Sequence, residues 1–366
     1  MAAQVPSDLL ARLEGRLDRV VVLRALMLGD LLCAVPALRA LRAGLPAAQI
    51  TLVGLPWAAE LAQRLDCVDH FIALPGYPGL PETPADVRAL PRFLETVQRE
   101  RYDLALQLHG SGAIVNSLLA TLGARYHAGF HDGACWYPRE REEEAALWRR
   151  WPQEGHEVMR LLALTDHLGL PRRGTALEFP VRPADRAQLT RLWPQVDAAE
   201  PYVCVHPGAQ LPSRRWLPER FAQVADGLAK QGYRIVLTGS AAEAALVRRV
   251  EECMHARPIN LAGHTSLWTL GALLERAVHL ISNDTGISHI AAALGTPSVI
   301  VSCGADVTRW APLDTARHRV LAHTVPCRPC SARVCPTGHE CAVGVSAERV
   351  LAAVPPPAVL PAMSHG

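Results

Sequence analysis

The sequence has almost no lysine. Lys230 is the only one in 366 residues, so nearly all positive charge is carried by arginine. A phosphate-binding site in this chain must therefore use guanidinium groups, which suit bidentate contacts to phosphate. The net charge of +2 also leaves no strongly basic face of the kind a dedicated nucleic-acid binder needs. We expect no nucleic-acid partner.

Long apolar runs are also missing. No stretch approaches the roughly 20 uncharged apolar residues of a membrane span. The first 19 residues carry Asp8, Arg12, Glu14 and Arg16, which break up the apolar core that a signal peptide requires. We therefore expect a cytoplasmic protein, in which the ten cysteines stay mostly reduced.

The length and the alternation of segments predict two α/β domains, because 366 residues exceed what one core typically organises. Strands are expected at 19–24, 49–53, 70–73, 104–108, 202–206, 233–237, 258–261, 279–281 and 298–301. Helices are expected at 82–100, 156–170, 218–230, 266–276 and 286–294. This alternation predicts parallel sheets, with ligands at the carboxyl ends of the strands. The predicted domains are 1–175 and 176–345, followed by a helix and tail over 346–366.

Two polar turns follow apolar strands, one in each half. Residues 282–286 lead from a strand into a helix, and the unpaired N–H groups at such a helix start attract an anion such as a diphosphate. In the first half, the apolar run 20–24 ends at a turn over 27–30 that contains Gly29 and Asp30. Two strand-turn-helix units with a carboxylate at each turn suggest two α/β halves that face each other across a cleft.

Six short motifs are spread along nearly the whole chain. They are Leu28-Gly29-Asp30 with Pro36-Ala37-Leu38, His206-Pro207-Gly208-Ala209, Ser213-Arg214-Arg215-Trp216, Asn260-Leu261-Ala262-Gly263, Ser282-Asn283-Asp284-Thr285-Gly286 with His289, and Leu294-Gly295-Thr296-Pro297. Each motif alone is weak, but their order and positions are specific. Taken together, they resemble the motifs of glycosyltransferase family 9, the ADP-heptose:lipopolysaccharide heptosyltransferase family.

This resemblance implies a GT-B fold, in which two Rossmann-like domains with parallel sheets face a central cleft. It implies inverting, metal-independent transfer of a heptose from a nucleotide diphosphate, with ADP-heptose as donor and a lipopolysaccharide-type glycan or glycolipid as acceptor. The sequence has no Asp-x-Asp motif to hold a divalent ion under a diphosphate, so we expect no catalytic metal and no cofactor. A lipid-linked acceptor implies weak peripheral contact with the inner face of the inner membrane. A different nucleotide sugar and glycan, or a noncatalytic protein built on the cysteine cluster, are the alternatives.

The family turn at Gly29 and Asp30 implies that Asp30 is the general base that takes the proton from the acceptor hydroxyl. Spacing alone favours a simpler interpretation, in which Asp30 is the N-cap of the following helix. At least one of Arg214 and Arg215 is expected to bind the diphosphate and stabilise the departing nucleotide, unless both are merely exposed basic residues.

The remaining donor-site residues follow from the same resemblance. Thr285 and Gly286 are expected to offer backbone N–H groups to the phosphates, with Asp284 near the donor sugar. His289 lies one turn into the helix and is expected to face the same site. His206 and Gly208 end a strand where the backbone approaches the ligand, and a side chain at Gly208 would block that approach.

Three further features have simpler explanations beside functional ones. Cys327, Cys330, Cys335 and Cys341 lie near His339, and structural zinc there competes with a plain cysteine-rich loop, because their spacing differs from that of a two-knuckle ribbon. Asn116, after the turn at 110–112, is expected to line the acceptor side, although an ordinary strand-to-helix turn explains that motif equally well. The charges over 139–144 indicate a solvated helix face.

Overall fold

The computed structural model describes residues 10, 13, 15–197 and 200–354. Most of the predicted N-terminal segment 1–19 and the tail 355–366 therefore lie outside the described residues. Within those residues, no helix combines the length and the apolar character needed to cross a bilayer. The chain divides into two compact units, and the boundary between them in the sequence lies between Pro180 and Val181. The predicted boundary lay five residues earlier, after residue 175.

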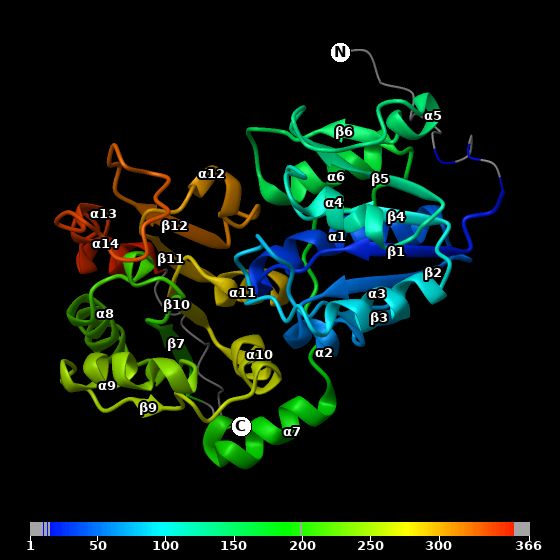
Figure 1. Cartoon of the computed structure of the whole chain (residues 1–366). Helices are drawn as coiled ribbons and strands as arrows, with labels where there is room; N and C mark the ends of the chain where they lie inside the picture. Colours follow the sequence, from blue (N-terminus) through cyan, green and yellow to red (C-terminus); the bar gives the residue numbers. More distant parts are fainter. Residues whose placement is uncertain (1–9, 11–12, 14, 198–199, 355–366) are drawn as a thin grey trace. The chain divides into compact units, whose positions relative to one another are not determined.

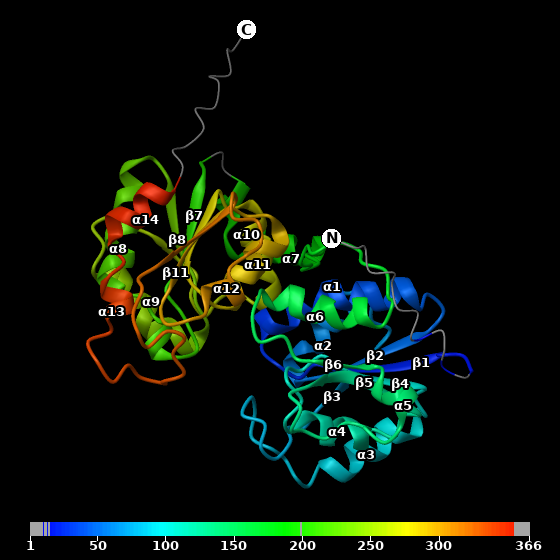
Figure 2. The same cartoon turned by 90° about the horizontal axis from the view of Figure 1, so that it is seen from above.

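The first unit is a parallel sheet with helices on both faces (Figure 1). Its strands run in the order β3-β2-β1-β4-β5-β6. Helices α1 and α6 pack together on one face, and α3 and α4 cover the other (Figure 2). The elements are β1 (Arg19–Leu23), α1 (Leu28–Gly44), β2 (Gln49–Gly54), α2 (Ala59–Ala62), β3 (His70–Ala73), α3 (Leu90–Arg99), β4 (Leu104–Gln107), α4 (Val115–Thr121), β5 (Tyr126–His131), α5 (Glu142–Ala145), β6 (Trp148–Arg150) and α6 (Glu157–His167).

The second unit repeats this architecture. Its strand order is β12-β11-β10-β7-β8-β9, and its registered strand pairs are parallel. Helices α8, α9 and α14 lie on one face, and α7, α10 and α11 lie on the other. The elements are α7 (Pro183–Leu192), β7 (Tyr202–His206), α8 (Pro218–Lys230), β8 (Arg234–Leu237), α9 (Ala244–Glu252), β9 (Ile259–Asn260), α10 (Leu267–Arg276), β10 (His279–Asn283), α11 (Gly286–Leu294), β11 (Ser298–Ser302), α12 (Val307–Trp310), β12 (His318–Ala322), α13 (Glu340–Val343) and α14 (Ala347–Ala353).

Both sheets have the doubly wound order 3-2-1-4-5-6, counted along each unit, which confirms the predicted pair of Rossmann-like domains. In such a sheet, the chain leaves the first and fourth strands toward opposite sides, and the gap between these strands at their carboxyl ends is the usual ligand site. These strands are β1 and β4 in the first unit and β7 and β10 in the second. The motif turns at residues 27–30, 206–209 and 282–286 follow three of them.

The C-terminal helix is part of the second unit's core. Helix α14 packs on α8, with Val350 and Ala353 buried in the same apolar cluster as Phe221 and Leu228. The segment from residue 346 to 354 is therefore continuous with the second Rossmann-like unit, and only the tail beyond it lies outside the described residues.

The helix predicted over 82–100 is wrong in its first half, because α3 begins at Leu90. Pro84 has no N–H to donate and also disfavours the helical conformation of the residue before it. The side chain of Asp86 then accepts hydrogen bonds from the backbone N–H groups of Arg88 and Ala89, at 3.1 and 3.3 Å. This local turn replaces the first helical turns, so Glu82 lies in a loop.

Candidate functional site

In the first unit, Asp30 is the third residue of α1, in the first turn of the helix. The N-cap is Met27, so the interpretation of Asp30 as the cap is wrong. Asp30 is half-buried and Gly29 beside it is buried. A carboxylate at this position benefits from the positive end of the helix dipole. The side chain therefore lies at the carboxyl end of β1, where the doubly wound sheet predicts a ligand.

Arg24, at the end of β1, fixes the backbone of that turn, a role that the sequence motifs did not reveal. Its guanidinium is fully buried and donates to the Asp30 carbonyl oxygen from Nη2 at 2.6 Å and from Nε at 3.2 Å. It also donates to the Leu108 carbonyl oxygen at the end of β4. Glu157, 1% exposed, supplies the counter-charge at 3.2 Å. One arginine thus joins β1, α1, β4 and α6 at this end of the sheet.

His109 and Glu82 complete this end of the first unit. The backbone N–H of Ala25 donates to His109 Nδ1 at 3.1 Å, which places the proton of a neutral ring on Nε2. That atom lies 3.9 Å from a carboxylate oxygen of Glu82. Burial raises the pKa of Glu82, but the His109 ring and the backbone lower it further, so the pKa lies below its ordinary value. The loop before α3 therefore contributes an ionised carboxylate here.

Asn116 has a structural role and offers no exposed surface that could line an acceptor site, contrary to the expectation from the sequence. It is fully buried. Its amide nitrogen donates to the carbonyl oxygens of Phe130 and Trp136 at 2.9 and 3.0 Å, and its oxygen accepts from Gln107 Nε2 at 3.0 Å. Asn116 therefore holds the loop after β5 against the end of β4.

In the second unit, one buried amide brings the motif loops together. Asn283, at the end of β10, donates from Nδ2 to the Pro207 carbonyl oxygen at 2.7 Å. Its Oδ1 accepts from the backbone N–H of Trp216 at 2.8 Å. Trp216 is itself 1% exposed and donates from its indole nitrogen to the Val345 carbonyl oxygen. The segments 206–209, 213–216 and 282–286 are therefore neighbours, as expected for three segments that were assigned to one donor site.

His206 and Gly208 lie beside Glu243. Burial lowers the pKa of His206, while Glu243 opposes this shift, so the ring is neutral at physiological pH. His206 Nδ1 lies 3.0 Å from the hydroxyl of Thr238. A Cβ added at Gly208 would lie 2.2 Å from the Glu243 carboxylate. A side chain at residue 208 would thus first meet the movable end of Glu243, and the approach of a ligand to Gly208 stays a prediction.

Asp284 lies in a mixed acidic and basic cluster. Its Oδ2 accepts a hydrogen bond from Ser302 Oγ at 3.2 Å. Burial raises the pKa of Asp284 above its ordinary value, although His289, Ser302, Arg214 and Arg328 oppose this. His289 is buried and acts on the Asp284 carboxyl, so it faces the same cluster.

The two predicted arginines are half-buried and hold backbone carbonyls. Arg214 donates to the Cys330 carbonyl oxygen, and Arg215 donates to that of Ala209 at 2.9 Å. A third arginine was not predicted from the sequence. Arg328 donates to the carbonyl oxygens of Ser302 and Ala305 at 2.6 and 2.8 Å. The Nε atoms of Arg214 and Arg328 are buried and have no hydrogen-bond partner among the described residues. These are the donors that an anion would satisfy.

Helix α11 begins at Gly286, directly after Asp284 and Thr285. Thr285 is the N-cap residue, and in the described structure its side chain makes no capping hydrogen bond. The first-turn N–H groups of a helix have no intrahelical partners, so this end of α11 presents donors at the carboxyl end of β10. This is the arrangement expected of a phosphate-binding helix start.

The cysteine-rich segment folds against the arginine loop. Ser213 donates from its N–H to the Arg333 carbonyl oxygen at 3.2 Å, and its own carbonyl oxygen lies 3.0 Å from His339 Nε2. In the described parts of the chain, no group of three or more His, Cys, Asp or Glu side chains is placed to hold a metal ion. Structural zinc at Cys327, Cys330, Cys335 and Cys341 therefore stays a prediction without a described ligand set.

We predict a pH-dependent stability change on replacing Asp284 with asparagine. A carboxyl whose pKa is raised by folding contributes most to stability below its ordinary pKa, and this contribution is lost as pH rises through the folded value. Asp284→Asn should therefore raise the unfolding temperature of the nucleotide-free protein at pH 8, with a smaller gain toward pH 4. Thermal unfolding as a function of pH, with exposed Asp66→Asn as the control, measures the difference. A lower unfolding temperature at pH 8 would show that the surrounding cations make the ionised form stabilising.

Comparison with known proteins agrees with this geometry. The profile of glycosyltransferase family 9 (heptosyltransferase) matches residues 90–340, more than half of the chain. That range contains the second-unit motifs, whereas Asp30 lies before it. Lipopolysaccharide heptosyltransferase 2 of Salmonella typhimurium is 25% identical over 302 residues, which cover 77% of this chain and 81% of the relative.

Two solved structures share the fold. The glycosyl transferase family 9 protein from Veillonella parvula has a TM-score of 0.78 at 22% identity, covering 93% of this chain and 97% of its own. The E. coli ADP-heptose lps heptosyltransferase II has a TM-score of 0.71 at 21% identity, covering 91% and 96%. These similarities confirm the predicted GT-B class of fold. The chain belongs to glycosyltransferase family 9, the heptosyltransferases, and is a glycosyltransferase.

Proposed function

We propose that this enzyme transfers a heptose from ADP-heptose to a hydroxyl group of a lipopolysaccharide-type glycan, with inversion at the anomeric carbon and without a metal ion. The names of the relatives support the donor and the acceptor class, since one is an ADP-heptose lps heptosyltransferase and another a lipopolysaccharide heptosyltransferase. The observation that carries the proposal is the cluster at the carboxyl ends of β7 and β10.

In the second unit, the diphosphate of the donor binds where cationic and N–H donors are concentrated. The start of α11 supplies the backbone N–H groups of Thr285 and Gly286, and the unpartnered guanidinium nitrogens of Arg214 and Arg328 lie close to Asp284. Negative charge on the leaving nucleotide grows in the transition state, so prearranged donors lower the barrier without a metal ion. Arg215 adds charge from the same loop.

Asp284 and His289 then face the sugar side of the donor. Asp284 accepts hydrogen bonds from sugar hydroxyls through its carboxyl oxygens. His206 and Gly208, at the end of β7, belong to the same cluster of loops, because Asn283 donates to the carbonyl oxygens of Pro207 and Gly208. These roles account for the polar motifs of the second unit.

In the first unit, Asp30 acts as general base. The acceptor hydroxyl is a weak nucleophile, and the carboxylate takes its proton as the oxygen bonds to the anomeric carbon and the bond to the diphosphate breaks. Gly29 leaves the turn free of a side chain beside that carboxylate. The proton ends on Asp30 and the electron pair of the broken bond ends on ADP.

The function is tested by incubating the purified protein with ADP-heptose and a heptose-lacking lipopolysaccharide core. The expected result is ADP release coupled to a new glycosidic bond of inverted configuration, measured by NMR, with no loss of rate in EDTA. Thermal unfolding with ADP, UDP, GDP and TDP tests the donor base, because a ligand at 100 times its Kd stabilises the fold by about 2.7 kcal/mol. A larger shift with another nucleotide, and transfer from its sugar, would favour a different donor.

A further inference from the structure

The first unit contains a cavity that none of the donor-site or base residues line. Its volume is about 640 Å³, and it is lined by the loop after β5 together with His127 of β5 and Glu144 of α5. Small-molecule sites in proteins have volumes of this order and combine aromatic walls with a few polar groups. The charges over 139–144 were expected to form a solvated helix face, but Glu144 is 4% exposed, so that expectation is wrong for this residue.

The polar wall of the cavity is formed by His127, one ring nitrogen of which has no hydrogen-bond partner among the described residues. Glu144 Oε1 accepts from the backbone N–H of His127 at 2.9 Å and lies 2.8 Å from His127 Nδ1. Its other oxygen accepts from Arg141 at 3.1 Å. Since an ionised carboxylate only accepts, Nδ1 carries a proton and Nε2 faces away from the pair. His127 is 9% exposed, and its Nε2 has no hydrogen-bond partner among the described residues.

A buried nitrogen without a partner costs about 1–3 kcal/mol, so this atom points to a ligand that satisfies it. The His127 side chain is one of those that line the cavity.

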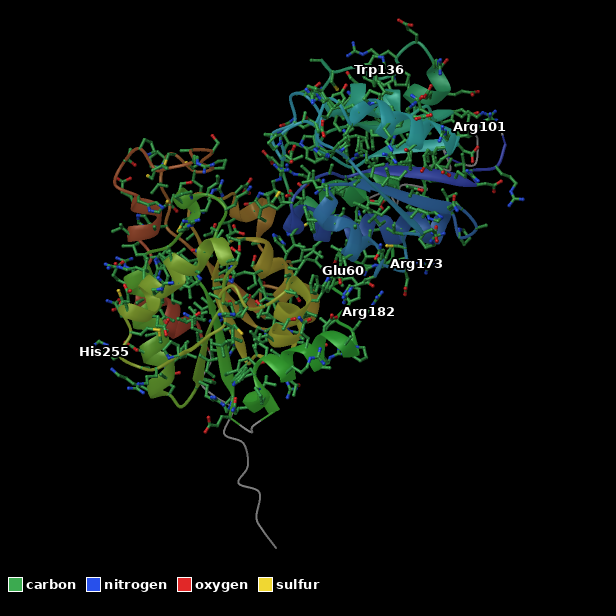
Figure 3. The ribbon with its side chains drawn as sticks, turned by 60° about the horizontal axis from the view of Figure 1, so that its bottom comes forward. Glu60, Arg101, Trp136, Arg173, Arg182 and His255 are labelled. Carbon is green, nitrogen blue, oxygen red and sulfur yellow. The ribbon has the colours of Figure 1, made fainter. Side chains whose placement is uncertain are left out.

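The aromatic wall is Trp136, which is 44% exposed, whereas Trp148 and Trp151 of the same unit are buried. Its ring meets His127 and Trp148 edge to face, with centroids 6.2 Å away in both cases. Figure 3 shows Trp136 at the surface of the first unit, among the segments that follow β4. Edge contacts hold the ring in place and leave a large apolar surface accessible, which suits stacking against a flat ligand.

The loop that carries Trp136 is tied to the catalytic end of the same sheet. Asn116 binds the Trp136 carbonyl oxygen and is held by Gln107. Gln107 in turn accepts from the backbone N–H of His109 at 2.8 Å, and His109 accepts from Ala25 next to the α1 turn. A continuous hydrogen-bonded chain therefore runs from the Asp30 turn to the wall of the cavity.

The charge around the cavity selects a neutral ligand. Two guanidiniums, Arg139 and Arg141, are balanced by two carboxylates, Glu140 and Glu144. A nucleotide or a phosphate would find no net positive charge here, unlike the cluster around Asp284. An apolar face beside a hydrogen-bonding histidine fits a sugar ring, which presents C–H groups on one face and hydroxyls at its edge.

We propose that this cavity is a subsite for a neutral sugar ring of the acceptor, which stacks on Trp136 and hydrogen-bonds through a hydroxyl to His127 Nε2. This inference rests on the proposed function, since it assumes a glycan acceptor. It assigns acceptor recognition to a preformed pocket of the first unit and gives Trp136 a role in substrate choice.

Steady-state transfer kinetics test the subsite. Trp136→Ala should raise the KM for the glycan acceptor about tenfold and leave the KM for ADP-heptose unchanged, because only the stacking surface is lost. Trp136→Phe keeps an aromatic face and should recover most of the acceptor affinity. Trp136 is half exposed, so both variants should fold, which thermal unfolding with and without ADP verifies.

The outcomes separate the two proposals. If the wild-type enzyme transfers heptose and Trp136→Ala keeps the wild-type acceptor KM, the subsite is wrong while the function stands. If the KM for the donor rises equally, Trp136 acts on the overall fold and the subsite is again wrong. If the wild-type protein shows no transfer, the function fails, and direct titration of core oligosaccharide by tryptophan fluorescence decides the subsite. A signal change lost in Trp136→Phe supports sugar binding there, and no saturable change rejects it.

Discussion

Replacing Asp30 with asparagine is expected to lower the rate of heptose transfer by a factor of about 10² to 10⁴, the usual contribution of a general base. Asparagine has the same shape but cannot take the proton of the acceptor hydroxyl. Binding of ADP should be unchanged, because the nucleotide cluster lies in the second unit. Measurement of kcat with saturating donor and acceptor, beside the ADP-induced shift in unfolding temperature, tests both expectations.

The control for Asp30→Asn must remove a first-turn carboxylate without touching the site. Asp30 stabilises the start of α1 through the helix dipole by about 0.3–1 kcal/mol, so part of any effect comes from the helix. Glu348→Gln removes the equivalent first-turn acid of α14 and should leave transfer at the wild-type rate. Transfer by Asp30→Asn within threefold of wild type would exclude Asp30 as the base.

The sequence predicts those elements best whose signals are local. The strand at Tyr202–His206 and the helices at Pro218–Lys230 and Gly286–Leu294 have the predicted bounds, since an apolar run or stripe ends at a proline or glycine in each case. The strand β5 was missed. Its sequence, Tyr126 to His131, has two histidines and no apolar run, and it becomes a strand because the neighbouring β4 and β6 pair with it.

The candidate site divides in the same way. The turns at Asp30, Gly208 and Asp284 could be predicted because each lies within a few residues of its strand. Arg24 and Arg328 could not, because their partners are largely backbone carbonyls that any residue provides, and all of these except the Asp30 carbonyl are distant in sequence. The burial of Glu144 likewise depends on His127, 17 residues away, and its neighbours in sequence suggest only solvent exposure.

Arg24 is the residue whose loss should damage both the fold and the reaction. Its guanidinium and the Glu157 carboxylate form a pair that is 0% and 1% exposed. Arg24→Met removes the positive member and leaves the Glu157 carboxylate buried without the counter-charge of Arg24, which costs about 3–5 kcal/mol of the free energy of unfolding. Chemical denaturation of the nucleotide-free protein measures this loss.

The double variant Arg24→Met with Glu157→Leu separates stability from catalysis. Replacing a whole buried ion pair by apolar residues of similar volume is often neutral, so the double variant should recover most of the lost stability. Transfer should stay low in the double variant, because Arg24 also holds the Asp30 carbonyl oxygen through two hydrogen bonds, and no apolar side chain replaces them. The measurement is kcat of the stable double variant. It is compared with kcat of Glu157→Gln, which keeps Arg24. Recovery of transfer together with stability would show that Arg24 supports the core only and does not position the turn that carries Asp30.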